Sequence, residues 1–92
     1  MGTSFEWDEE KRQKIIQMRG LDLLIAARIF DGPVLTELDT RYPYGEDRYI
    51  SIGKVEEDWF VVVHTARGNA LRLITAWRAG RAARLRYQKR HP

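Results

Sequence analysis

The chain contains no cysteine, which excludes disulfides, thiolate zinc sites and cysteine nucleophiles. It also lacks an apolar run near the roughly 18 residues of a membrane helix, and it does not begin with the basic and then apolar order of a signal peptide. We therefore expect a cytoplasmic protein without membrane association. With 92 residues, 43% of them hydrophobic, residues 1–92 suffice for one domain and not for two.

Acidic residues are missing from the last third of the chain. Residues 63–92 contain eight Lys and Arg and no Asp or Glu, whereas residues 1–62 contain eight basic and thirteen acidic residues. The chain has 12 Arg against 4 Lys, and the planar guanidinium group fits phosphates and base edges. This asymmetry indicates a polyanionic partner. Composition alone leaves open a solvated helix or one that binds an acidic protein.

Two helices are predicted near the N-terminus. The first begins after Asp8, with acidic residues in its first turn and cations in its last, and ends at Gly20. The second begins after Asp22 and ends before Asp31-Gly32-Pro33. Their apolar residues are spaced to cover one face of a sheet.

The rest of the chain has the patterns of strands and then of a helix: residues 48–55 and 70–77 alternate, whereas residues 59–65 are apolar almost throughout, as in a central strand. A short edge strand is expected at 34–38 and three clear strands at 48–55, 59–65 and 70–77, joined by short turns. Arg78 to about Lys89 is predicted to be a helix, weakened by Gly80, that either lies loosely on the sheet or is held by a partner. The fold class is therefore α+β, with two N-terminal helices packed on a small antiparallel sheet of three to four strands and a C-terminal helix.

An ordered set of short motifs extends over nearly the whole chain, from Phe5 to Tyr87. These are Phe5-Glu6-Trp7-Asp8-Glu9-Glu10-Lys11, Phe30-Asp31-Gly32-Pro33, Tyr44-Gly45-Glu46-Asp47-Arg48, Val62-Val63-His64-Thr65-Ala66-Arg67, Arg72-Leu73-Ile74-Thr75-Ala76-Trp77-Arg78-Ala79 and Arg84-Leu85-Arg86-Tyr87. Together they resemble the BrnT family, the ribonuclease toxins of bacterial type II toxin–antitoxin systems. The resemblance implies a RelE-like α+β domain that binds and hydrolyses RNA and is neutralised by a BrnA-like antitoxin, whose ribbon-helix-helix part binds DNA.

Two positions depart from the family pattern. Members typically have Lys-His-Gly at the end of the first helix, where this chain has Met18-Arg19-Gly20. After the last strand Trp77 stands where the family has a cation. These departures favour the alternative function, a catalytically impaired domain of the same fold that binds nucleic acid or the antitoxin.

Metal-independent RNA cleavage by 2′-OH attack needs a base, an acid for the leaving oxygen and cations for the charge that develops on phosphorus. The candidate catalytic residues are Glu46, Arg48, His64, Arg67, Arg72 and Arg78. Arg81, Tyr44 and Tyr42 are candidates for binding RNA, through a phosphate or through stacking on bases. We predict no metal and no cofactor, because two His and no Cys provide no metal-ligand set.

Each candidate also has a purely structural interpretation. Glu46 could be the base or a salt-bridge partner of Arg48 or Arg67. His64 could be the acid or a packed, hydrogen-bonded residue of a central strand. Arg72 could bind phosphate or form a structural ion pair.

Arg78 and Arg81 are expected side by side at the start of the last helix, where they could hold adjacent phosphates or only be solvated. The antitoxin is expected at the last helix and at the unpaired edge of Val34 to Leu38.

Overall fold

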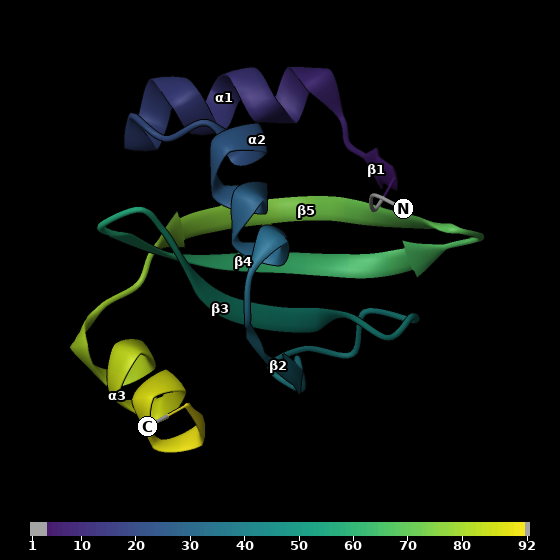
Figure 1. The fold of residues 1–92 in the computed structure, drawn as a ribbon. Helices are drawn as coiled ribbons and strands as arrows, with labels where there is room; N and C mark the ends of the chain where they lie inside the picture. Colours follow the sequence, from purple (N-terminus) through teal and green to yellow (C-terminus); the bar gives the residue numbers. More distant parts are fainter. Residues whose placement is uncertain (1–3, 92) are drawn as a thin grey trace.

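A computed structural model of the protein describes residues 4–91 as one mixed sheet with helices on both of its faces (Figure 1). The elements in chain order are β1 (Ser4–Glu6), α1 (Glu9–Arg19), α2 (Leu23–Ala26), the 3-10 helix η1 (Ala27–Asp31), β2 (Leu35–Leu38), β3 (Tyr49–Val55), β4 (Asp58–Arg67), β5 (Ala70–Arg78) and α3 (Arg81–Arg90). The strand order is β1-β5-β4-β3-β2. The predicted α+β class is confirmed.

The sheet is larger than predicted and is not wholly antiparallel. Strands β2 to β5 form the expected antiparallel series, but β1 adds a fifth strand parallel to β5, with Ser4 opposite Ala70. Three residues are too few to show a period of two, and the partner of β1 lies more than sixty residues away in the chain. The sequence pattern therefore could not indicate this strand.

Side-chain caps fix the two N-terminal helices. The Asp8 carboxylate accepts hydrogen bonds from the backbone amides of Glu10 and Lys11, and α1 ends at Gly20 with a φ of 62°. Asp22 caps α2 by accepting from the amide of Leu24. The second predicted helix is in fact one α-helical turn of four residues, followed by the narrower 3-10 helix η1.

The main core lies between these helices and one face of the sheet, which we call the helix face. Ala26 and Ile29 are fully buried against Val62 of β4 and Ala76 of β5. Gly53 of β3 allows Ile29 to lie this close to the sheet, since a Cβ added at Gly53 would lie 2.9 Å from the Cβ of Ile29.

The second face of the sheet, the α3 face, has a smaller core. Leu35, Ile52 and Val61 are buried there beneath Trp59, Trp77 and three residues that follow β5, namely Ala79, Ala83 and Tyr87. The Tyr87 ring meets the Trp59 ring edge-on, with centroids 4.9 Å apart. No residue of α3 is buried, so this helix rests on the sheet by few contacts, as its narrow apolar face predicted.

The last helix begins three residues later than predicted. Arg78 is the end of β5, where it lies opposite Phe60 of β4, and Gly80 precedes the first turn of α3 as its N-cap. The sheet ladder thus retains Arg78, and the glycine separates strand from helix. None of the helices in residues 4–91 is long and apolar enough to cross a membrane.

Candidate functional site

Glu46 lies between two arginines in the loop that leads into β3. One carboxylate oxygen is 3.4 Å from the Arg48 guanidinium, and the other is 3.4 Å from that of Arg67 at the end of β4. The Thr65 hydroxyl of β4 donates to the Asp47 carbonyl at 2.6 Å, which holds this loop against the sheet. The ion pairs expected for Glu46 are therefore present.

Arg72 extends this group from β5. It lies directly opposite Thr65 in the ladder, and its guanidinium is 3.5 Å from the Glu6 carboxylate of β1. Together with Lys11 of α1, the residues Glu46, Arg48, Arg67 and Arg72 line one pocket of 190 Å³, which we call the arginine pocket. Its four cations exceed the carboxylates of Glu46 and Asp8 that share the lining, so the pocket suits an anion.

The loop beside the pocket is built on one buried carboxylate. Asp39 accepts hydrogen bonds from the Arg41 guanidinium at 2.8 and 2.9 Å and from the Tyr44 hydroxyl at 2.9 Å. The Arg41 hydrogen bonds hold the pKa of Asp39 well below its usual range. The Arg48 guanidinium stacks 4.3 Å from the centre of the Tyr44 ring. Because Asp39 holds Tyr44 by a hydrogen bond, it also helps to position Arg48 of the pocket.

Tyr42 is the more accessible of the two loop tyrosines. Its side chain is 67% exposed, and its ring meets that of Tyr44 edge-on at 5.8 Å. The structure therefore brings both tyrosines close to the arginine pocket, with Tyr44 partly covered by Arg48 and Tyr42 open to a stacking partner.

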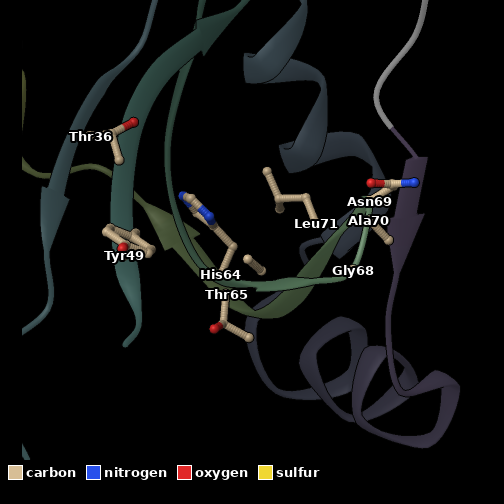
Figure 2. Close-up of a pocket in the computed structure, with 9 residues that line it drawn as sticks. Thr36, Tyr49, His64, Thr65, Gly68, Asn69, Ala70 and Leu71 are labelled. Atoms are coloured by element: carbon tan, nitrogen blue, oxygen red, sulfur yellow. The ribbon is translucent and has the colours of Figure 1, made fainter. Parts of the chain in front are cut away.

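His64 lies on the opposite side of the sheet from the arginine pocket. Figure 2 shows its ring on the side of Thr36, Tyr49 and Leu71, whereas Thr65 points away from them. Its Nε2 is 2.7 Å from the Ser51 hydroxyl, and its ring meets Phe30 of η1 edge-on at 5.1 Å. Burial lowers the pKa of His64 to about 4, so the imidazole is neutral at pH 7. This is the environment of a packed, hydrogen-bonded histidine.

Arg78 and Arg81 are not brought to the arginine pocket. Arg78 forms a 3.5 Å ion pair with Asp58 and lies over the Phe60 ring at 5.4 Å. It is six residues from Arg72 along β5, which amounts to about 20 Å of strand. Because Arg78 belongs to β5 and Arg81 to α3, the prediction that both lie on one helix surface is wrong.

Two residues near the site were not among the predicted ones. Lys11 reaches the pocket only because α1 packs beside β5, a long-range contact that leaves no local signal. Arg41 covers the Trp77 ring at 5.4 Å while it pairs with Asp39. The Asp39-x-Arg41 spacing in a turn could have indicated that pair, although not the contact with Trp77.

Fold and site together define a small α+β protein in which three arginines and a lysine line one pocket with the Glu46 carboxylate. The family model described as the ribonuclease toxin, BrnT, of type II toxin–antitoxin systems matches residues 7–82. The chain therefore belongs to this family: it is a toxin with ribonuclease function, with RNA as substrate and an antitoxin as partner. A comparison with curated proteins gives no match.

Proposed function

We propose that the arginine pocket is the site at which this toxin cleaves RNA, without a metal ion, by attack of a 2′-OH on the adjacent phosphorus. The observation that carries the proposal is that Arg48 from the loop before β3, Arg67 from the end of β4 and Arg72 from β5 line one pocket with Glu46, which is ion-paired to the first two. Fixed guanidinium groups are suited to the charge that develops on a phosphate in the transition state.

In this mechanism Glu46 accepts the proton of the 2′-OH. Its two ion pairs hold the carboxylate in one orientation, so that a phosphate bound by Arg67 and Arg72 places the ribose beside it. The oxygen attacks phosphorus, the bond to the 5′-oxygen breaks, and the products carry a 2′,3′-cyclic phosphate and a 5′-hydroxyl group.

The leaving 5′-oxygen needs a proton, and we assign its donor to Lys11. The ammonium group lines the same pocket, and loss of solvent around it, followed by repulsion from Arg48, lowers the pKa of Lys11 and makes it a better acid. His64 is outside this mechanism because it is neutral and faces the other side of the sheet.

Bases that flank the cleaved bond are proposed to stack on Tyr42 and against the Arg48–Tyr44 pair. An exposed aromatic ring beside an arginine favours single-stranded RNA, whose bases are free to stack. The antitoxin is proposed to be BrnA-like, with a ribbon-helix-helix part that binds DNA.

A second candidate function is a domain that has kept binding and lost catalysis. Arg19, at the position of the family's histidine, donates hydrogen bonds to the Thr75 hydroxyl at 2.9 Å and to the Ala76 carbonyl at 2.8 Å. Trp77, at the position of a family cation, is covered by Arg41. Both positions thus have structural roles in this chain, which favours this candidate.

A cleavage assay decides between the two. Wild type, Glu46→Gln and Arg72→Ala are incubated with end-labelled single-stranded RNA in EDTA, with Arg28→Ala on η1 as a control that removes an exposed arginine elsewhere. We expect cyclic phosphate ends from wild type and control, and a loss of about 100-fold or more in both pocket variants. Cleavage that survives both substitutions refutes the site, and salt-sensitive RNA binding without cleavage supports the second candidate.

A further inference from the structure

The edge of the sheet formed by β2 has chemistry that fits one kind of partner. We propose that the antitoxin docks here by adding a strand to β2, and that the residues of this strand alternate between apolar and acidic. The inference rests on the proposed function only in that it takes the partner to be the antitoxin, and it is independent of the cleavage mechanism.

The backbone of β2 has one unpaired side. In the strand order of residues 4–91, β2 is the last strand and pairs only with β3. The Asp39 amide donates to the Arg48 carbonyl at 2.7 Å, which continues the ladder beyond Leu38. Because antiparallel ladders alternate, Leu35 and Glu37 bond to β3, whereas the amide and carbonyl groups of Thr36 and Leu38 point outward. These outward groups are the ones that an added strand binds.

On the helix face, this edge is apolar. Thr36 is hydrogen-bonded to Ser51 at 2.7 Å, and Leu38, two residues on and therefore on the same face, is 51% exposed. Thr36, Tyr49, His64 and Leu71 line a largely apolar pocket of 360 Å³ that opens beside them (Figure 2). Side chains of an added strand on this face would lie next to Thr36 and Leu38, so apolar residues fit there.

On the other face, the same edge is backed by a cationic helix. Glu37 pairs with Arg86 of α3, the Tyr87 hydroxyl donates to the Pro33 carbonyl at 3.2 Å, and the His91 ring reaches the Val34 carbonyl at 3.3 Å. Helix α3 contains five Lys and Arg and no acidic residue. Side chains of an added strand on this face would meet these cations, so acidic residues fit there.

Two other occupants fit the edge less well. RNA cannot complete a β ladder, because the outward groups of Thr36 and Leu38 are spaced for a peptide backbone. A second copy of this chain could pair β2 with β2, but it would bring two α3 helices of the same charge to one interface. Charge therefore favours a different, acidic chain.

The test uses the toxin and the antitoxin purified as their natural complex and recombined from the separated chains. Leu38→Pro removes an outward amide without breaking the pairing with β3, and Leu38→Ala is its matched control because it removes the side chain and keeps the amide. We expect the antitoxin to bind Leu38→Pro at least about tenfold more weakly than Leu38→Ala. Thermal unfolding of both free variants verifies that each is folded.

Amide hydrogen exchange and a charge variant complete the experiment. In the complex we expect new protection at the amides of Thr36 and Leu38 and little change at Glu37, which is already bonded to β3. Arg90→Glu on α3 should weaken binding by about threefold or more relative to Lys14→Glu on α1, a control with the same change in charge.

Several results would overturn the proposal. These are equal antitoxin affinity of the two Leu38 variants, unchanged exchange at Thr36 and Leu38 in the complex, or protection of these amides in a homodimer of the free chain. RNA cleavage by the free Leu38→Pro variant is measured alongside. If wild type also fails to cleave RNA, the proposed ribonuclease mechanism is contradicted. The binding results would still show whether the antitoxin docks at β2.

Discussion

Burial of a neutral histidine makes the stability of this protein depend on pH in a defined window. His64 is 7% exposed and hydrogen-bonded to Ser51, and its pKa is about 4 in the folded chain against 6.5 for a free histidine. The unfolded chain therefore binds a proton at a pH where the folded chain does not. The stabilisation is complete above pH 6.5 and is lost as the pH falls from there towards 4.

The size of the effect follows from these two pKa values. At pH 5 an unfolded histidine is almost wholly protonated and the folded one is not, so the free energy of unfolding should be about 2 kcal/mol lower than at pH 7.5. His64→Gln keeps a side chain that can hydrogen-bond to Ser51 and removes the titration. We expect this variant to lose only a few tenths of a kcal/mol over the same range, through its carboxylates.

Urea unfolding at pH 7.5, 6.5, 5.5 and 5.0, followed by tryptophan fluorescence, measures both proteins under identical conditions. The quantity of interest is the difference between the two slopes of unfolding free energy against pH, in which the carboxylates common to both chains cancel. Parallel slopes for wild type and His64→Gln would show that His64 is not held neutral by burial. The reasoning that separates it from the RNA site would then fail as well.

Three further predictions concern the loop, the core and the site. Asp39→Asn weakens the hydrogen bonds of this side chain to Arg41 and Tyr44 and should lower the free energy of unfolding by about 2 kcal/mol in urea titrations. An unchanged urea midpoint would contradict the structural role given to this buried carboxylate. Gly53→Ala places a Cβ 2.9 Å from that of Ile29 and should cost about 1–3 kcal/mol in the same assay, whereas Gly32→Ala, with no atom within 4 Å, is the neutral control. Arg72→Ala should reduce the slope of log affinity against log salt for single-stranded RNA by about 0.7, as expected for one lost phosphate contact, and an unchanged slope would remove Arg72 from the binding site.

Local patterns were sufficient for most of the secondary structure. Asp8 and Gly20 define the ends of α1 because capping and a left-handed terminus are properties of neighbouring residues. Alternating residues likewise predict β3 and β5, a continuous apolar run predicts β4, and the short turns between them predict antiparallel neighbours. The predictions fail where pairing between distant residues determines the structure. Strand β1 forms only by pairing with β5, and Arg78 stays in the sheet because it pairs with Phe60.

The candidate site was likewise predictable from the sequence only in part. The sequence by itself indicated the candidate residues, because charge, aromatic rings and the family motifs can be read from the chain, and Glu46 with its neighbouring arginines is among these candidates. Only the tertiary structure decided which of them meet. Alternation along β4 turns His64 and Thr65 to opposite faces, so the histidine joins the helix face while Arg67 and Arg72 join Glu46 and Lys11. The physical reason is that the site is assembled across strands and a helix distant in sequence, and their contacts are fixed by packing and ladder register.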